Sequence, residues 1–346
     1  MRRKEIEKRI NDIFSESVPD VLDNILKICE EKKGFEDKMK VDKNKKIEKH
    51  QENKKDFFKI PNLVGGLACA FVAVFCFIGL YRYKALNSVD TIIEFDVNPS
   101  VELKVDKDDD VIEAIPLNND GKKVLGDMEF DNVDLDIAVN AIVGSMIKNG
   151  YLTVDENSIL VSVKNKDAKK ENKLQDKISK EIDEILKSMS IDGSILSQSL
   201  SDDNEIEKIA KKYDISVGKA KLVNGIIKTN LTNSKGEAYT EESLSKLSIN
   251  ELNLLLTSKN TKVENVTSSG SSASEKSYIG KEKAKDIAFK DANVSSSSVY
   301  DLEVELDCDD GKLVYEVDFK INGNEYEYEI NAKDSKIMFK EVDKDD

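Results

Sequence analysis

The chain has 346 residues, 35% of them charged, with a formal net charge of −15 and a single histidine, His50. One histidine excludes a Ser-His-Asp triad and a multi-histidine metal centre. An acidic chain without tryptophan is also a poor candidate for direct binding of nucleic acid. The four cysteines, Cys29, Cys69, Cys76 and Cys308, include no CxxC pair, so we expect neither a zinc site nor a disulfide framework.

Residues 1–34 predict a short helical arm with one apolar stripe. Pro19 fits the first turn of a helix, Ser17 can cap it and Gly34 can end it. The stripe consists of apolar residues at helical spacing, namely Val18, Val21, Leu22, Ile25 and Ile28. A helix this short is marginal by itself in water, so we expect the stripe to bind a partner protein. Self-association and contact with a membrane surface remain alternatives, and residues 35–59 read as a charged tether.

One uncharged apolar run, LVGGLACAFVAVFCFIGLY at residues 63–81, has about the length that a bilayer core requires. It lies too far from residue 1 and is too long for a signal peptide, so we expect a transmembrane helix within residues 60–83. Many lysines between Lys40 and Lys59 precede the run, whereas an acidic region follows it. The positive-inside rule therefore predicts a single-pass protein of the cell membrane with a cytoplasmic N-terminus and extracytoplasmic C-terminal domains.

Residues 88–262 predict an α+β domain outside the membrane. Alternating apolar residues indicate strands at 91–97, 101–105, 111–117 and 158–163. Helical periodicity indicates helices near 133–149, 170–189, 203–213, 217–229 and 241–256. The NNDGK sequence after the third strand predicts a turn. Residues 263–276, which contain SSGSSAS, predict a flexible linker and a domain boundary.

Residues 277–343 predict a small second α+β domain. It should contain one helix at 281–292 and strands near 299–306, 312–321, 325–330 and 337–342. Asp310-Gly311 and Asn322-Gly323 are strong signals for hairpin turns. Asp307, which stands just before the first of these turns, belongs to an acidic group that lacks the ligand spacing of an EF-hand. We therefore expect a solvated turn there, with no metal site and no cofactor anywhere in the chain.

Several segments together resemble the RsgI family of membrane anti-sigma factors over roughly residues 60–257. They are the apolar run, then TIIEFDVNPSVELKVDKDDDVIEAIPLNNDGKKVL, YDISVGKAKLVNGII and LSKLSINELNLLL. Residues 277–343, from GKEKAKDIA through VYEVDFKINGNEYEYEIN, resemble a PepSY domain. The resemblance implies a protein that sequesters a sigma factor at the cytoplasmic face and is not a turnover enzyme. This chain has a helical arm where the family usually carries a small β-rich module with a sequence like KGIVME.

The resemblance further implies that the protein cuts its own Asn98–Pro99 bond, and the residue types suit that reaction. Pro99 has no backbone N–H, so the usual attack of the next residue's nitrogen on the asparagine side chain is blocked. The Asn98 amide nitrogen can instead attack its own carbonyl carbon and expel Pro99. Asp96, Ser100 and the NNDG loop are candidate helpers. Without the resemblance, Pro99 would be read as the first residue of an edge strand.

The resemblance also implies how the signal travels. An envelope signal would separate the two cleaved pieces, and an intramembrane protease would then free the sigma factor. Two other functions remain open: an envelope-anchored peptidase inhibitor or chaperone that acts through the PepSY-like domain, and a structural anchor associated with the cell wall. The sequence identifies no envelope ligand.

Overall fold

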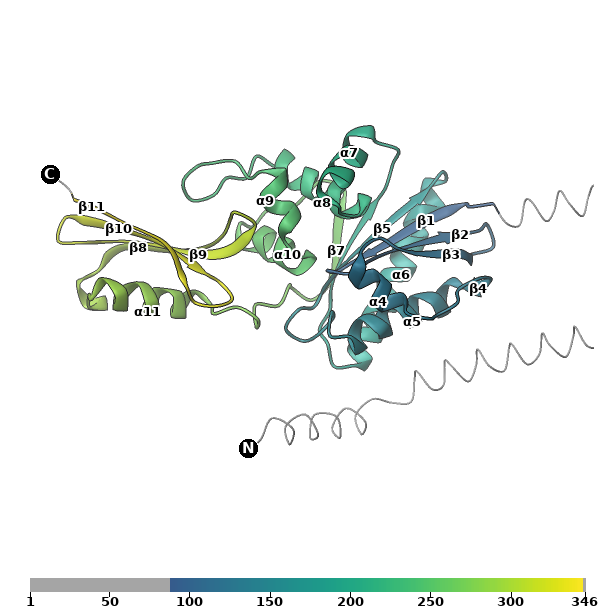
Figure 1. Cartoon of the computed structure of the whole chain (residues 1–346), viewed down its shortest axis with the longest axis horizontal. Helices are drawn as coiled ribbons and strands as arrows, with labels where there is room; N and C mark the ends of the chain where they lie inside the picture. Colours follow the sequence, from purple (N-terminus) through teal and green to yellow (C-terminus); the bar gives the residue numbers. More distant parts are fainter. Residues whose placement is uncertain (1–87, 345–346) are drawn as a thin grey trace, which may run out of the picture. The chain divides into compact units, whose positions relative to one another are not determined.

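The computed structural model describes residues 88–344. The predicted arm (1–34), tether (35–59) and transmembrane helix (60–83) therefore lie outside the described residues. Within residues 88–344, none of the helices combines the length and the apolar character needed to cross a bilayer. Val89–Asp346 belong to one structural unit of mixed α and β structure with two sheets (Figure 1).

The first sheet has seven strands in the order β4-β3-β2-β1-β5-β6-β7. Its strands are β1 (Thr91–Asp96), β2 (Ser100–Val105), β3 (Asp110–Pro116), β4 (Val133–Asp134), β5 (Ser158–Asn165), β6 (Ser194–Ser199) and β7 (Val266–Gly270). All neighbours are antiparallel except β5 and β6, whose parallel pairing is made by the crossover helix α6 (Ala168–Ser188). Strand β1 therefore lies in the interior of the sheet, paired with β2 on one side and β5 on the other.

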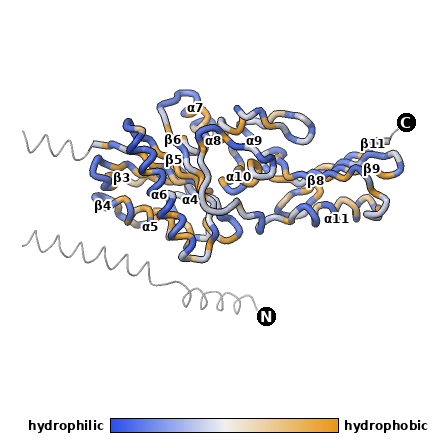
Figure 2. Tube along the Cα trace, turned by 180° about the vertical axis from the view of Figure 1, so that it is seen from behind, coloured by the Kyte–Doolittle hydropathy of each residue, from blue (hydrophilic) through white to orange (hydrophobic). Residues whose placement is uncertain are grey.

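The two faces of β1 meet different environments, because successive side chains of a strand point to opposite faces. Ile93 and Phe95 are fully buried in a core that also includes apolar residues of α5 (Leu135–Lys148) and α6. Glu94 and Asp96 point to the opposite face, where the start of α8 (Val217–Lys228) lies against them. Figure 2 shows hydrophobic stretches along the strands and helices, with hydrophilic residues between them.

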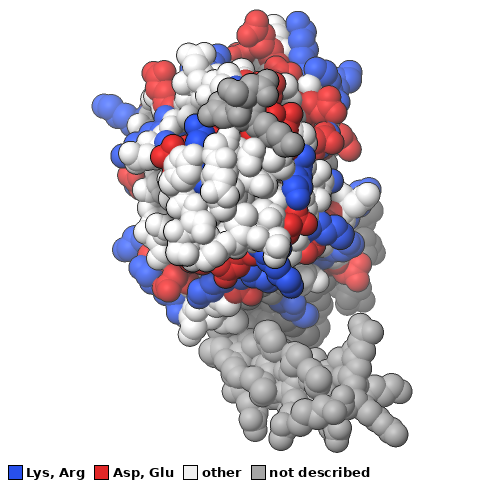
Figure 3. Space-filling model, turned by 90° about the vertical axis from the view of Figure 1, so that its left-hand side faces the viewer, with Lys and Arg blue, Asp and Glu red and all other residues white. Residues whose placement is uncertain are grey.

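The second sheet has the order β11-β10-β9-β8 and is antiparallel throughout. Its strands are β8 (Tyr300–Asp309), β9 (Lys312–Ile321), β10 (Asn324–Asn331) and β11 (Ile337–Lys344), and α11 (Lys281–Ala292) packs on one face. Both predicted hairpin turns are confirmed, because Asp310-Gly311 and Asn322-Gly323 have positive φ at both residues. The end of the molecule that carries this sheet shows an uncharged centre with lysines and carboxylates around it (Figure 3).

The two sheets are joined through shared packing. Leu252 and Leu255 of α10 (Ile249–Ser258) share a hydrophobic core with Tyr315 and Val317 of the second sheet. The remaining helices are α4 (Asn119–Leu125), α7 (Asn204–Tyr213) and α9 (Glu241–Lys246), with a short 3₁₀ turn at Ser296–Ser298. The second domain is thus packed directly onto the helices of the first.

The structure differs from the sequence-based expectations in several places. The expected helix 241–256 is divided into α9 and α10, because Ser248 caps the second helix in a capping box with Glu251. The NNDGK turn begins helix α4, and β6 had not been predicted. The serine-rich segment, expected as a flexible linker, forms β7 and pairs with β6.

Candidate autocleavage site

The Asn98–Pro99 bond lies in the turn between two interior strands. Strands β1 and β2 pair up to Asp96 and Ser100, which leaves Val97, Asn98 and Pro99 as the connecting turn. The Val97 N–H donates to the Pro99 carbonyl at 3.0 Å, which closes the turn. Asn98 is exposed and Pro99 is buried. Pro99 is therefore not the first residue of an edge strand, since β2 has β1 and β3 as neighbours.

One side chain, Asn118, contacts the backbone on both sides of this bond. Its Nδ2 donates to the Asn98 carbonyl oxygen at 2.8 Å. Its Oδ1 accepts from the backbone N–H groups of Ser100 at 3.2 Å and Gly121 at 2.7 Å, the latter as the N-cap of α4. An N–H donor on the carbonyl oxygen is the group that stabilises a developing oxyanion. The NNDG loop is one of the helpers expected from the sequence, and its first asparagine, Asn118, contacts the bond in the structure.

Glycine is required at position 121 for this approach. A Cβ atom there would lie 2.3 Å from the Ser100 carbonyl oxygen, a distance that real Cβ atoms do not show. The absence of a side chain therefore lets the first turn of α4 rest against the backbone of β2, and so places the Asn118 cap beside Asn98.

Asp120 lies beside the amide nitrogen that would act as nucleophile. Asn98 Nδ2 makes a long contact of 3.4 Å with Asp120 Oδ2. The other carboxylate oxygen of Asp120 accepts from Lys123 Nζ at 2.7 Å and from the Tyr151 hydroxyl at 2.8 Å. The hydrogen bonds from Lys123 and Tyr151 hold the pKa of Asp120 below its ordinary value. Asp120 is thus an oriented carboxylate that can hold the Asn98 amide in place.

Behind the turn, on the α8 side of β1, lie two buried carboxyl groups. Glu94 is 2% exposed and Asp96 is 1% exposed. Burial, with a smaller contribution from the charge of Asp96, raises the pKa of Glu94 to about 8, although the Gly218 N–H that donates to Glu94 Oε2 at 2.6 Å opposes the shift. The raised pKa favours the protonated form of Glu94 at neutral pH.

Asp96 is the more isolated of the two carboxyl groups. Burial raises its pKa, while the hydroxyls of Ser100 and Ser216 and the charge of Lys219 oppose the rise. Those hydroxyls are near neighbours only, because neither Asp96 oxygen has a hydrogen-bond partner within the described part of the chain. The amino end of α8, where the helix dipole favours negative charge, faces both acids.

Gly218 allows this close approach of helix and strand. A Cβ there would lie 2.4 Å from Ser162 Oγ and 3.0 Å from carboxylate oxygens of both Glu94 and Asp96. Its carbonyl accepts from Gln198 Nε2 at 2.7 Å, and the same nitrogen donates to Ser162 Oγ at 3.0 Å. Because the Gly218 carbonyl can only accept, the Gln198 nitrogen must face it.

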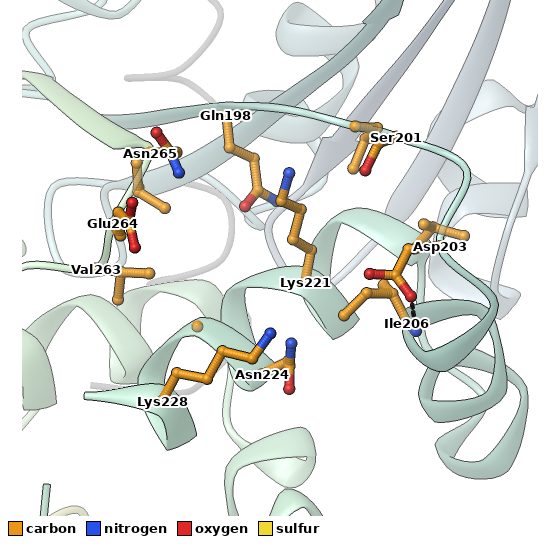
Figure 4. Close-up of a pocket in the computed structure, with 14 residues that line it drawn as sticks. Gln198, Ser201, Asp203, Ile206, Lys221, Asn224, Lys228, Val263, Glu264 and Asn265 are labelled. Carbon is orange, nitrogen blue, oxygen red and sulfur yellow. Dashed lines mark hydrogen bonds between the residues drawn. The ribbon is translucent and has the colours of Figure 1, made fainter. Parts of the chain in front are cut away.

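Gln198 also lines a cavity of about 240 Å³ between α8 and residues 263–266 (Figure 4). Lys221, Asn224 and Lys228 reach this cavity from one side of α8. Its lysines are balanced by Asp203 and Glu264, so the lining charges select no one class of ligand.

A third element that holds the turn is α10, which also packs against the second domain. The first backbone N–H of α10, that of Ile249, donates to the Val97 carbonyl oxygen at 3.1 Å. The residue preceding Asn98 is therefore fixed by α10, while the residues that follow it are fixed by the Asn118 cap. Asn98 is the exposed residue between these two attachments.

The candidate residues thus fall into separate groups. Asn98 and Pro99 lie together with the NNDG loop, and Ser100 contributes its backbone N–H there. Asp96 belongs to the buried group at α8. The predicted partner-binding residues Val18, Val21, Leu22, Ile25 and Ile28 lie outside the described residues. Sequence reasoning missed Glu94, Tyr151, Gly218 and Lys219, although the alternation of EFD, which puts Glu94 and Asp96 on one face of a strand, was a usable signal.

Comparison with known proteins identifies both domains. Residues 90–225 match the family model of the anti-sigma factor RsgI-like central domain. Residues 278–341 match the PepSY domain, described as the peptidase propeptide and YPEB domain. The chain therefore contains an RsgI-like central domain followed by a PepSY domain, as the resemblance in its sequence indicated.

The chain is also similar, over part of its length, to several curated proteins. The chain is 28% identical over 189 residues to anti-sigma-I factor RsgI4 of Acetivibrio thermocellus, covering 52% of this chain and 33% of that protein. It is 27% identical over 165 residues to anti-sigma-I factor RsgI of Bacillus subtilis, covering 47% of this chain and 42% of that protein. The uncharacterized protein Spy1430 of Streptococcus pyogenes is 41% identical over 70 residues, 20% of this chain and 54% of that protein. This chain thus spans less than half of the length of the two anti-sigma-I factors.

Proposed function

We propose that the protein is a membrane-spanning anti-sigma factor that sequesters a sigma factor at the cytoplasmic face and releases it by regulated proteolysis. The RsgI-like central domain and the anti-sigma-I factors that share it support the proposal. The uncharged run at residues 63–81, the lysines before it and the apolar stripe of the arm fit a cytoplasmic partner and a membrane location. The protein acts as a regulator, and its one chemical step occurs once per chain.

The observation that carries the cleavage step of this proposal is the hydrogen bond from Asn118 Nδ2 to the Asn98 carbonyl oxygen, 2.8 Å long. In the proposed cleavage, Asn98 Nδ2 bonds to the Asn98 carbonyl carbon, and Asn118 stabilises the negative charge on the oxygen. The bond from that carbon to the Pro99 nitrogen then breaks. The proton lost from Nδ2 ends on the departing Pro99 nitrogen, and Asn98 is left as a succinimide. No other reactant is needed.

The cut chain should remain assembled. The fragment that ends at Asn98 keeps β1, which pairs with β2 and β5 and buries Ile93 and Phe95 completely. Two ladders of backbone hydrogen bonds and the buried apolar area hold this strand in place. Removal of the outer domain from β1 by an envelope signal would leave a short membrane stub, the substrate expected for an intramembrane protease.

The test uses the full-length chain purified in detergent. We expect two fragments on a denaturing gel and one species on a sizing column, whereas Asn98→Ala should run as one intact chain. Asn119→Ala, next to the Asn118 cap in the same NNDG sequence, serves as the control and should be cut like the native chain. Equal cleavage of Asn98→Ala and the native chain would refute self-cleavage.

The partner is tested separately. Immobilised residues 1–59 should retain a sigma factor from cytoplasmic extract of the source cell. Retention of no sigma factor would favour the peptidase inhibitor as the function, because that function places the activity in the PepSY domain.

A further inference from the structure

The PepSY sheet has a second face, away from α11, that is lined by carboxylates. On β9 the apolar residues Tyr315, Val317 and Phe319 belong to the core, so the alternating Glu316 and Asp318 point to the other face. The cross-strand register places further carboxylates beside these two. The acidic face is defined here as Glu303, Glu316, Asp318, Glu327, Glu329 and Glu341.

Four of these residues form one row across all four strands. Glu303 pairs with Asp318, Asp318 with Glu327, and Glu327 with Glu341. Like charges directly opposite each other destabilise a sheet. Among the described residues, only Glu327 in this row has a lysine within ion-pair distance, namely Lys235 at 3.5 Å. The row borders an open hollow of about 550 Å³.

A buried carboxylate in the next row, Glu316, has no ion pair among residues 88–344. Glu316 is 4% exposed, and its Oε2 has no hydrogen-bond partner in the part of the chain that the structure describes. Burial raises the pKa of Glu316 to about 7 and that of Asp318 to about 6, and neighbouring carboxylates add to both shifts. The Ser234 hydroxyl opposes the shift of Glu316. Burying a carboxylate without a cation is costly, and a purely structural sheet face would not need Glu316 there.

One lysine of the chain, Lys235, already forms ion pairs with this face. Lys235 comes from the loop between α8 and α9, outside the PepSY domain. Its Nζ lies 2.6 Å from Glu329 Oε1 and 4.3 Å from the centre of the Phe339 ring. Lys235 occupies the end of the face near Glu329, and Lys320, which also borders the hollow, lies 3.7 Å from Glu325. Among residues 88–344, Glu303, Asp318 and Glu341 have no ion pair.

We propose that the row of Glu303, Asp318, Glu327 and Glu341 on the acidic face is a docking surface for an extended, lysine- or arginine-rich segment of a partner protein. Adjacent strands lie about 4.8 Å apart, so the row of four carboxylates spans about 14 Å. An extended segment that crosses the strands presents a side chain on the same side about every 7 Å, so two or three basic side chains can reach the row. A metal ion fits less well, because no group of three or more carboxylates within residues 88–344 has the arrangement of a metal site.

The test uses the full-length chain with Asn98→Ala in detergent and a fluorescent synthetic peptide with lysine at alternate positions. The face variant combines Glu303→Gln, Asp318→Asn and Glu341→Gln. The control variant removes the same charge from exposed helix positions of the central domain, by Asp176→Asn, Glu205→Gln and Glu207→Gln. We expect the face variant to weaken peptide binding about tenfold and to reduce its salt dependence, and the control to change binding less than about twofold.

The face variant should also melt at a higher temperature than its parent, because it removes like-charge contacts. A higher melting temperature would show that the loss of peptide binding is not caused by unfolding. Equal weakening by the two variants would reveal general attraction to an acidic protein and would overturn the proposal. Unchanged peptide binding by the face variant would overturn it, as would calorimetric binding of Ca²⁺ at this face without binding of the peptide.

Discussion

Replacement of Glu94 by glutamine should stabilise the fold at neutral and alkaline pH. Burial, followed by the charge of Asp96, raises the pKa of Glu94 from 4.5 to about 8, and the Gly218 N–H opposes the rise. Glutamine keeps a carbonyl oxygen that can accept from Gly218 and fills nearly the same volume. It differs from glutamate chiefly in that it carries no charge at any pH.

The magnitude follows from the two pKa values. A carboxyl group whose pKa is higher in the folded state favours folding while it is protonated in both states. That advantage is lost as the pH rises from the unfolded value of about 4.5 through the folded value of about 8. At about 1.4 kcal/mol per pKa unit, the complete shift corresponds to about 5 kcal/mol. Because Asp96 shares the same buried site, we expect about 2 to 3 kcal/mol of this to be recovered by Glu94→Gln.

The assay is urea unfolding of residues 88–346 carrying Asn98→Ala, followed by far-ultraviolet circular dichroism at about pH 5 and about pH 8.5. The parent should lose stability between the two pH values, and Glu94→Gln should lose about 2 to 3 kcal/mol less. Glu113→Gln, an exposed carboxylate paired with Lys104 at 2.8 Å, is the control and should change the pH dependence little. An identical pH dependence in the parent and Glu94→Gln would refute the assignment of a buried proton to this site.

Three further predictions concern separate parts of the chain. Asn118→Ala removes the donor to the Asn98 carbonyl and should slow cleavage about 10²- to 10³-fold, measured as accumulation of fragments on denaturing gels; cleavage at the native rate would exclude Asn118 as an oxyanion donor. Leu22→Asp should abolish retention of the sigma factor by residues 1–59, since it places a charge on the apolar stripe; unchanged retention would remove this stripe from the interface. Tyr239→Phe removes the hydroxyl that donates to the fully buried Asp307 at 2.6 Å and should lower the free energy of unfolding by about 1 to 3 kcal/mol, measured by urea titration. No change would show that Lys259 and the Ser234 N–H are enough to stabilise the buried carboxylate.

Local backbone chemistry explains what could be predicted from the sequence. Asp310-Gly311 and Asn322-Gly323 specify hairpin turns by themselves, because both residues tolerate positive φ. The NNDG loop could likewise be connected to Asn98–Pro99, although it begins a helix where a turn was expected. Asn118, the N-cap of α4, lies only 20 residues from Asn98 in the sequence and donates to its carbonyl oxygen. The two residues are separated in the chain only by the neighbouring strands β2 and β3.

Long-range pairing explains what could not be predicted. The contact between the amino end of α8 and Glu94 depends on the parallel pairing of β5 with β6, which α6 connects. No local sequence pattern specifies that pairing. The serine-rich segment has the composition of a flexible linker, yet Asn157 bonds the Ser272 carbonyl at 3.0 Å and the Ser274 N–H at 2.7 Å.

Asp307 was wrongly expected in a solvated turn. It is fully buried, because Tyr239 and Lys259 of the central domain bond to its carboxylate. Those partners lie far from Asp307 in the sequence, so the spacing of the acidic residues around it carried no sign of its burial.

The position of β1 determines how a cut chain would respond to load. The strand is held by six paired residues on each side, and the chain enters it at Thr91 from the direction of the N-terminus. Tension between an anchored N-terminus and the outer domain would act along the axis of β1. Both ladders would then be loaded in shear, so their hydrogen bonds would resist together rather than open one after another. Such a joint would yield abruptly above a threshold force, so a cut sheet would withstand weak, continual tension.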